Sequence, residues 1–154
     1  CNFYSYTCIK CNNILSKNCL CIFITLGGIM KEVLFKLLEN SRSDYFNFPV
    51  SAGIVTTKGT FYGVNVETSS PSAGICAERN ALYNAFTNGI KKEDIKEIHV
   101  ASKNAVTPCF ICRQALVDFC SLDTKVLMYG LSGEEKELLV SDLCTHTFSK
   151  GDIK

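Results

Sequence analysis

Three cysteines and one glutamate have the residue types and the spacing of a metal site. Cys76 and Glu78 stand in a CAER segment, and Cys109 and Cys112 stand in a PCFIC segment later in the chain. Three thiolates would give a tetrahedral zinc ion three ligands and leave one position open, which is typical of a catalytic site that holds a water molecule. Bound zinc lowers the pKa of that water toward neutrality. We therefore predict a catalytic zinc centre on these cysteines.

Glu78 is predicted to move protons beside this centre. It stands too close to Cys76 in the chain to be a comfortable fourth ligand, yet it falls in the same helical turn. A carboxylate there can take a proton from the zinc-bound water and return it to a ring nitrogen and a leaving amine, as in zinc deaminases, which can use three cysteine ligands. Arg79 is the candidate cation that offsets the excess negative charge of three thiolates.

Other interpretations of the cysteines are a structural zinc knuckle or simple burial. Cys120 is the candidate fourth ligand of a structural site, but it stands eight residues after Cys112. Eight residues span about 12 Å along a helix axis, which excludes Cys120 while the helix holds. His99, in a predicted strand, and His146, near the C-terminus, are expected to have structural roles.

The elements that must position these residues alternate between helices and strands. Helical patterns cover residues 31–41, 76–89 and 109–120, β-rich segments cover 51–57, 60–66, 95–102, 125–130 and 136–140, and a short helix closes the chain. Turns are predicted at Lys58-Gly59 and Ser132-Gly133, and Asn88-Gly89 is predicted to end the second helix. The alternation predicts an α/β layer fold in which helices pack on a mixed sheet.

Composition excludes several classes of partner. The chain has 154 residues, enough for one domain with a core of its own, and 47% of them are hydrophobic. Its 16 basic and 15 acidic residues give a net charge of +1 without a basic cluster, so no nucleic-acid partner is predicted. Five cysteines after residue 30, an odd number, fit a reducing compartment better than a disulfide framework. We therefore predict a cytoplasmic protein without a membrane partner.

The first 29 residues have no helical or alternating period. We expect Met30 to be the natural start, residues 1–29 to be a cysteine-rich leader outside the fold, residues 30–149 to form the domain, and residues 150–154 to be a tail. Alternatives for the leader are a signal peptide on the apolar run CLCIFITLGGI and a second zinc site. The cysteines of that second site would be Cys8, Cys11, Cys19 and Cys21.

From about Met30 to Phe148 the chain resembles the small, homotetrameric cytidine deaminases of pyrimidine salvage. CAERNAL and PCFICRQAL match the two zinc motifs of that family, C-A-E-R and P-C-x-x-C-R-Q, and NVE matches its N-[IV]-E segment. YFNFPVSAG is similar to its Y-S-x-F-x-V-G-A-A stretch, and VSDLCTHTF is similar to its closing segment.

The resemblance implies a three-layer fold, a mixed sheet of about five strands with helices on both faces. It also implies one zinc ion per subunit, a homotetramer, and hydrolytic deamination of cytidine and 2′-deoxycytidine to uridine and 2′-deoxyuridine with release of ammonia. By matching position, Asn65 and Glu67 would hydrogen-bond the sugar, Phe48 would pack against the pyrimidine, and the backbone of Ala77 would bond its edge. Phe148 would reach the site of a neighbouring subunit.

The sequence departs from the family pattern at three places. Phe110 replaces a glycine between two ligands, Ser51 replaces a glycine, and Pro71 replaces a tyrosine in a loop that completes a neighbouring site in the family. Two other functions remain open: deamination of another aminopyrimidine nucleoside, such as a cytosine-nucleoside antibiotic, and a non-catalytic, zinc-stabilised homologue.

Overall fold

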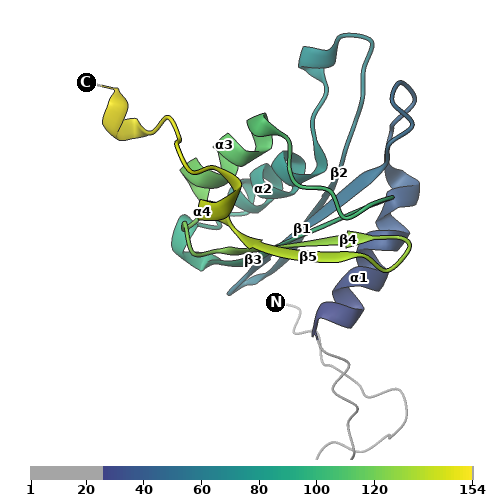
Figure 1. Ribbon diagram of the computed structural model, residues 1–154, viewed down its shortest axis with the longest axis horizontal. Coiled ribbons are helices and arrows are strands. Elements are labelled where there is room, and N and C mark those ends of the chain that lie inside the picture. The colour runs from purple at the N-terminus through teal and green to yellow at the C-terminus, as the bar shows by residue number, and fades with distance from the viewer. Residues whose placement is uncertain (1–25, 154) are drawn as a thin grey trace, which may run out of the picture.

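A mixed five-stranded sheet lies at the centre of the computed structural model, which describes residues 26–153 (Figure 1). Its strands lie in the order β2-β1-β3-β4-β5, with β3 and β4 parallel and the other neighbours antiparallel. The strands are β1 (Val50–Thr56), β2 (Gly59–Val64), β3 (Ile95–Ser102), β4 (Lys125–Gly130) and β5 (Glu135–Leu139). The helices are α1 (Leu26–Leu37), α2 (Ala77–Thr87), α3 (Phe110–Phe119) and α4 (Val140–Leu143).

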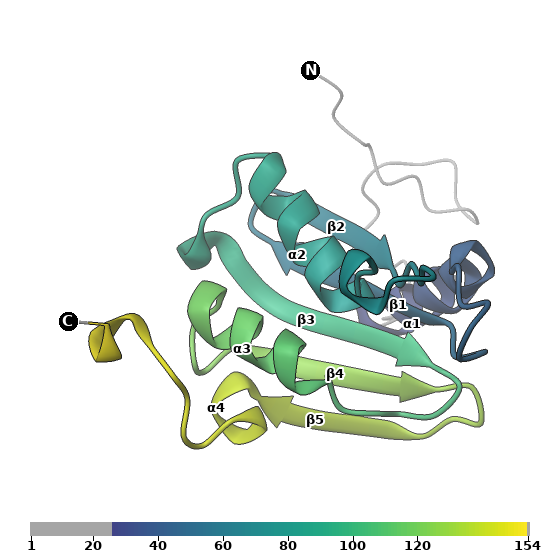
Figure 2. The same cartoon turned by 90° about the horizontal axis from the view of Figure 1, so that it is seen from above.

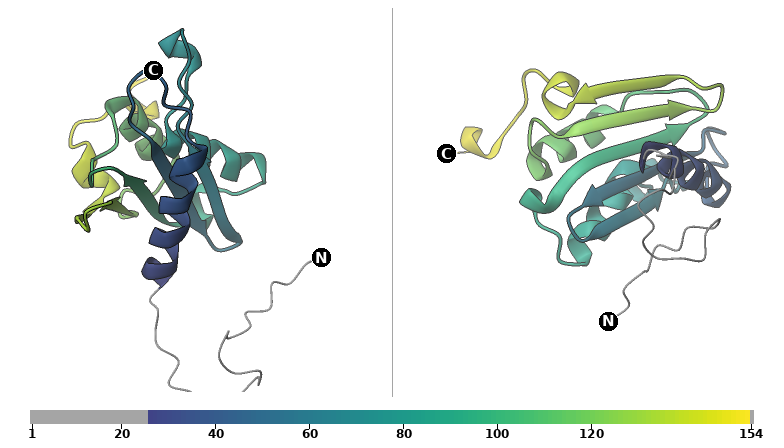
Figure 3. Two further views of the ribbon diagram at one scale, coloured as in Figure 1. Left: turned by 90° about the vertical axis from the view of Figure 1, so that its right-hand side faces the viewer. Right: turned by 90° about the horizontal axis from the view of Figure 1, so that it is seen from below.

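Helices cover both faces of the sheet. Helices α2 and α3 lie side by side over one face (Figure 2), and α1 lies over the opposite face (Figure 3). The five-stranded mixed sheet and the three layers confirm the predicted fold class. Among residues 26–153, no helix is long and apolar enough to cross a bilayer.

Each face of the sheet has a hydrophobic cluster, because successive strand residues point to opposite sides. On β3, Ile98 and Val100 belong to the cluster under α2 and α3, whereas Ala101 packs with Leu34 of α1. All four side chains are at most 2% exposed. Strand β3 is therefore buried on both faces over residues 98–102, whereas Lys96 and Glu97 near its start are exposed or partly exposed.

A glycine on β2 allows α2 to approach the sheet closely. A Cβ atom added to Gly63 would lie 2.4 Å from the backbone nitrogen of Ala81 in α2. Any side chain at this position would therefore push the helix away from the sheet. This contact helps to set the position of the α2 N-terminus, where Cys76 stands.

The predicted elements match the observed ones to within about two residues, except for α1, whose end at Leu37 is followed by a 3₁₀ turn over Leu38–Asn40. This helix begins at Leu26, five residues before the predicted one, and Met30 is a buried residue in it. Residues 26–29 are therefore helical, although the leader was expected to lie outside the fold. The expectations for residues 1–25, including the second zinc site, lie outside the described residues.

The sheet register gathers distant segments at one edge of the fold. Strand β1 starts opposite the end of β3, where Val50 pairs with Ser102, and the end of β2 pairs with Ser51. The loops before β1, after β2 and after β3 therefore leave the sheet at the same edge. These loops carry Phe48, Asn65 and Cys109, the residues that the sequence marked for chemistry.

Candidate active site

Two of the three predicted zinc ligands stand at the N-termini of neighbouring helices. Cys76 is the N-cap residue of α2 and Cys109 is the N-cap residue of α3. Cys112 lies one turn further along α3 and is fully buried. The positive ends of both helix dipoles therefore point toward this cluster, where they favour thiolates.

The three sulfur atoms lie close enough together to bind one zinc ion. Those of Cys76 and Cys109 are 3.7 Å apart, and the three sulfurs all lie within 4.8 Å of one another. A tetrahedral zinc ion at about 2.3 Å from each sulfur separates two sulfurs by about 3.8 Å. The donor set and its spacing thus fit a three-cysteine zinc site. Among the described residues no other histidine, cysteine or carboxylate joins this group.

Electrostatics at the cluster favour a charged thiolate on Cys76. A hydrogen bond from Cys112 and the nearby Arg79 lower the pKa of Cys76 to about 5, against the opposing effect of burial. Although burial lowers the pKa of Arg79, its interactions with the Cys76 and Cys112 sulfurs raise it overall. Arg79 thus lies where the sequence predicted a compensating cation. Its Nε atom is buried and has no hydrogen-bond partner among residues 26–153.

Glu78 stands beside the cysteines in the first turn of α2. Only 6% of this residue is exposed, and burial raises the pKa of its carboxyl group. Glu78 lines a hollow of about 340 Å³ together with Cys76, Cys109 and Ala77. This volume lies within the range of small-molecule sites. The carboxyl group therefore lies next to the cysteine cluster and at the space open to a substrate.

The same hollow contains the other residues that the resemblance marked for substrate. Phe48, Asn65 and Glu67 line it. The structure thus brings together every predicted zinc, proton-transfer and substrate residue, and it places Arg79 next to the sulfurs of Cys76 and Cys112. The sequence did not indicate five further lining residues, which are Phe46, Val50, Val100, Val106 and Thr107.

Asn65 fixes the backbone around the site. Its Oδ1 atom accepts hydrogen bonds from the Val50 backbone N–H at 2.8 Å and from Ser41 Oγ at 2.6 Å. Its Nδ2 atom donates to the Phe48 carbonyl oxygen at 3.0 Å. An amide nitrogen has two protons, so one remains for a ligand. Asn65 therefore fixes the backbone at Phe48 and Val50, and its second Nδ2 proton is available to a ligand in the hollow.

Glu67 holds the loop on the other side of Phe48. Its Oε2 atom accepts backbone N–H groups from Tyr45 at 2.8 Å and Phe46 at 3.0 Å. Both bonds fall on one oxygen, and no residue of the described chain bonds the other, Oε1. Because an ionised carboxylate has about four acceptor positions, Oε1 is available to a hydroxyl group.

The positions that depart from the family pattern do not disturb the cysteine cluster. The Phe110 ring is 78% exposed and lies 4.8 Å below the Arg113 guanidinium, outside the sulfur group. Ser51 is buried and donates to the Leu34 carbonyl oxygen at 2.7 Å, which ties α1 to β1. Pro71 begins a short exposed 3₁₀ turn.

The residues that were set aside as ligands lie elsewhere. Cys120 is the buried C-cap residue of α3 and stands apart from the three sulfurs, as predicted. His99 is buried in β3, where its Nδ1 atom lies 2.8 Å from the hydroxyl oxygen of Tyr129. His146 is exposed in the C-terminal segment.

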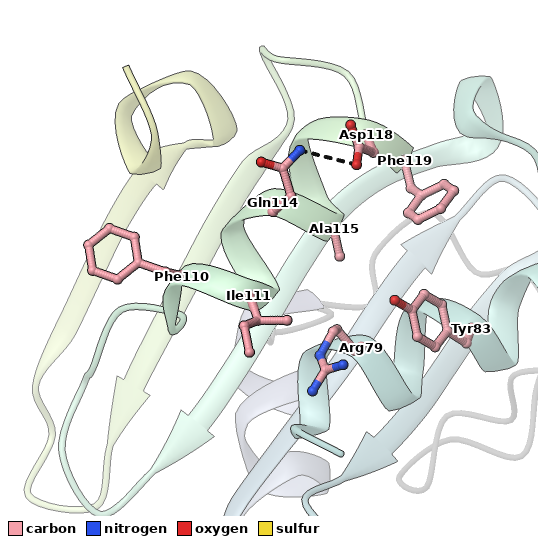
Figure 4. Close-up of a pocket in the computed structure, with 8 residues that line it drawn as sticks. All are labelled: Arg79, Tyr83, Phe110, Ile111, Gln114, Ala115, Asp118 and Phe119. Carbon is pink, nitrogen blue, oxygen red and sulfur yellow. Dashed lines mark hydrogen bonds between the residues drawn. The ribbon is translucent and has the colours of Figure 1, made fainter. Parts of the chain in front are cut away.

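A second hollow, of about 440 Å³, lies between α2 and α3 on the side away from the sheet (Figure 4). Tyr83 and Phe119 meet edge to face across it, with ring centroids 6.2 Å apart. Ile111 points toward Arg79, and Asp118 lies at the far end of α3 (Figure 4). Neither Glu78 nor any of the three cysteines of the metal cluster lines this hollow. We call it the α2–α3 hollow.

A family model described as the cytidine and deoxycytidylate deaminase zinc-binding region matches residues 29–130. The chain belongs to this family. The matched region contains all three cysteines and Glu78, so zinc is the cofactor that the cysteine cluster holds. The resemblance that the CAER, PCFIC and NVE segments indicated is therefore confirmed.

Curated relatives and solved structures agree with this family. A cytidine deaminase from Sporosarcina psychrophila is 34% identical over 119 residues, which cover 77% of this chain and 88% of that protein. A cytidine deaminase from Mycoplasma genitalium is 31% identical over 128 residues, covering 82% and 98%. The crystal structure of cytidine deaminase from Burkholderia pseudomallei superposes with a TM-score of 0.74 at 29% identity, covering 78% of this chain and 97% of that one.

Proposed function

We propose that this deaminase converts cytidine and 2′-deoxycytidine to uridine and 2′-deoxyuridine, with consumption of water and release of ammonia, in pyrimidine salvage. One observation carries the proposal: a buried glutamate and two cysteines of a three-sulfur cluster line one hollow, whose walls also hold an amide, a second carboxylate and an aromatic ring. The glutamate and the cysteine sulfurs serve the chemistry, and the wall residues serve recognition of a nucleoside.

In this proposal Cys76, Cys109 and Cys112 hold the zinc ion, and Arg79 offsets the negative charge of their thiolates. When bound, zinc supplies the Lewis acidity that lowers the pKa of a water molecule toward neutrality. Three thiolates exceed the charge of a divalent ion, so a cation beside the sulfurs helps to preserve that acidity.

Glu78 carries the protons in the proposed reaction. It takes a proton from the attacking water and delivers it to the ring nitrogen next to the reacting carbon, while the water oxygen bonds to that carbon. Glu78 then takes the proton of the new hydroxyl group and delivers it to the amino group. The carbon–nitrogen bond breaks, ammonia leaves, and a carbonyl group remains. Such transfer contributes typically 10²- to 10⁴-fold to a rate.

The wall residues position the nucleoside. The remaining N–H of Asn65 and the Oε1 atom of Glu67 bind sugar hydroxyl groups, and Phe48 packs against the pyrimidine. The Ala77 backbone N–H stands in the first turn of α2, where helix N–H groups lack partners within the helix, and bonds the pyrimidine edge. A site built to bond a sugar hydroxyl discriminates against a ligand without one, because its buried polar groups then stay unpaired.

The direct test measures zinc content and turnover on purified protein. We expect about one zinc ion per chain and a fall in ultraviolet absorbance with cytidine and with 2′-deoxycytidine, matched by ammonia release. Zinc binding without turnover of either nucleoside would favour a non-catalytic homologue. Turnover of a different aminopyrimidine nucleoside alone would favour the second alternative.

We further propose a homotetramer in the cytoplasm. The α2–α3 hollow exposes Tyr83, Ile111 and Phe119, and it has Arg79 at one end and Asp118 at the other (Figure 4). A patch with both charges can meet a second copy of itself about a two-fold axis, so that unlike charges face each other.

A tetramer needs a second contact between the dimers. Phe110 extends away from Arg79 and Tyr83 (Figure 4), and Phe148 is 63% exposed in the C-terminal segment. These two rings supply apolar surface for that contact. The cytoplasmic location is supported by the five free cysteines among residues 26–153, three of which serve a thiolate zinc site.

A further inference from the structure

Phe46 stands at the opening of the proposed active site. Phe46 is 74% exposed. It lines the hollow that holds Glu78, and it also lines an adjoining hollow of about 230 Å³ over Pro71 and Ile75. Phe46 is therefore part of the ridge between the two hollows, next to the space where a substrate would lie.

The backbone of Phe46 is fixed by a residue of the site itself. Its N–H donates to Glu67 Oε2 at 3.0 Å, as does the N–H of Tyr45 at 2.8 Å. The next residue, Asn47, has a positive φ of 49° and donates its N–H to the Ser43 carbonyl oxygen at 2.9 Å. Asparagine tolerates this left-handed conformation better than most residues. The loop thus makes a closed turn that holds Phe46 in place.

The other side of the loop is fixed in the same way. The Phe48 carbonyl oxygen accepts a hydrogen bond from Asn65 Nδ2 at 3.0 Å. Residues 45–48 are therefore anchored by Glu67 and Asn65, the two side chains that we propose for the sugar. Because the backbone is anchored, covering a ligand requires ordering of the Phe46 side chain but not of the loop.

Phe46 and Phe48 provide aromatic surface at two depths of one hollow. Phe48 is half-buried, whereas Phe46 is exposed at the opening. Small ligands are held best when most of their surface is buried, and aromatic rings supply a large contact area. Glu67 and Asn65, which we propose for the sugar, are hydrogen-bonded to the loop that carries Phe46. A ring at this place covers the sugar side of a bound nucleoside.

We propose that Phe46 is a nucleoside-binding residue whose ring packs over the sugar of the substrate and closes the open side of the hollow. The proposal rests on the function proposed above. It assigns Phe46 to affinity and to the distinction between a nucleoside and a free base. It gives this residue no part in proton transfer, because the ring has no titratable group.

The variant Phe46→Ala tests the proposal through two independent quantities, the KM for cytidine and the Kd for uridine, which binds without reacting. We expect both to rise roughly 5- to 20-fold, as for loss of one aromatic contact, while kcat stays within about twofold. Phe46→Tyr keeps the ring and should restore both. Because Phe46 is exposed, zinc content and the melting temperature should not change.

Tyr45→Ala is the matched control. Tyr45 is also an exposed aromatic residue, at 56%, its backbone makes the same bond to Glu67, and its side chain lines neither of the two hollows. We expect its KM and Kd to stay within about twofold of the wild type. An equal rise in both alanine variants would show a general effect of the loop and would overturn the proposal.

Other results separate this proposal from the proposed function. If wild-type protein deaminates cytidine and Phe46→Ala has unchanged KM and Kd, only the role of Phe46 is wrong. If kcat falls while KM and Kd do not change, the role is also wrong. If wild-type protein binds uridine without deaminating cytidine, the proposed function fails, and the Kd comparison still decides the role of Phe46. If it does neither, both proposals fail.

Discussion

The sulfur of Cys76 lies 3.7 Å from the sulfur of Cys109, although 33 residues separate these cysteines in the chain. Each residue caps the N-terminus of a helix, and the two helices lie side by side on one face of the sheet (Figure 2). The positions of α2 and α3 therefore bring these two sulfurs together. The third ligand, Cys112, follows one turn later on α3.

The first prediction concerns these ligands. Cys109→Ser should lose most of its zinc, because it removes one of three thiolates, and it should lose turnover with it. Cys144→Ser is the matched control, since Cys144 is a free, partly exposed cysteine outside the sulfur group. Metal analysis of both purified variants measures the effect. Full zinc content in Cys109→Ser would show that Cys109 is not a ligand.

A second prediction concerns proton transfer. Glu78→Gln keeps the shape of the side chain but cannot carry a proton, so it should retain zinc and fold while kcat falls by at least about 100-fold. Zinc content and the melting temperature serve as controls for the metal and the fold. A variant that stays within about tenfold of the wild type, a change of about 1.4 kcal/mol in the barrier, would exclude Glu78 as the proton carrier.

Sequence patterns predicted the strands better than the start of α1. Strand 95–102 and strand 125–130 have their predicted bounds, since each is a β-rich run between turn residues. Gly27 and Gly28 disfavour a helix by roughly 1 kcal/mol each relative to alanine, so the local pattern begins after them. In the structure Met30 and Leu34 pack on the sheet, and this tertiary contact extends the helix beyond the local signal.

The site residues were likewise predicted where the sequence signal is local and missed where their position depends on strand pairing. Cys76, Glu78, Cys109 and Cys112 were predicted because helix periodicity and ligand chemistry are local. Phe46, Val106 and Thr107 reach the hollow only through the antiparallel pairing of β1 with β3, and sequence does not display that register. The bonds of Asn65 to the backbone before β1 were missed for the same reason.

A third prediction concerns pH and stability. Burial lowers the pKa of His99, whereas its contact with Glu97 acts in the opposite direction. As pH falls below 6.5, the ordinary pKa, the histidine takes up a proton in the unfolded chain before it does so in the folded protein. Protonation therefore favours unfolding, and the free energy of unfolding should decrease from about pH 6.5 downward.

Urea unfolding of wild type and His99→Gln at pH 7.5, 6.5 and 5.5 measures this effect. Zinc release at low pH affects both proteins alike, so the difference between them at each pH isolates His99. We expect the variant to lose less stability than the wild type between pH 6.5 and 5.5. Parallel curves would show that His99 does not contribute to the pH dependence.

A fourth prediction concerns the N-terminal boundary of the domain, which we propose lies at Met30. A chain that begins at this residue removes the first turn of α1, which contains two glycines, and keeps the buried Met30 and Leu34. We expect it to bind zinc and deaminate cytidine as the full chain does. Loss of solubility or of activity in the shortened protein would show that residues before Met30 stabilise the domain.

The last prediction tests assembly through the α2–α3 hollow. Ile111 is 65% exposed there and points toward Arg79 (Figure 4), so Ile111→Arg places a second cation beside the first. In a self-complementary contact the loss of this apolar side chain and the burial of an added charge occur twice, once for each copy. We expect light scattering to show a particle smaller than four chains at micromolar concentration. Leu131→Arg, which changes a 60% exposed leucine in the β4–β5 turn, should remain a tetramer.

Deletion of residues 148–154 examines the second contact of the same assembly. The Phe148 carbonyl oxygen accepts a hydrogen bond from Gln114 Nε2 at 2.8 Å, which holds this segment near α3 while leaving its ring exposed. If the ring completes a neighbouring site, the deletion should weaken cytidine binding more than zinc retention. A wild-type monomer with full activity would contradict both experiments, because each site would then be complete within one chain.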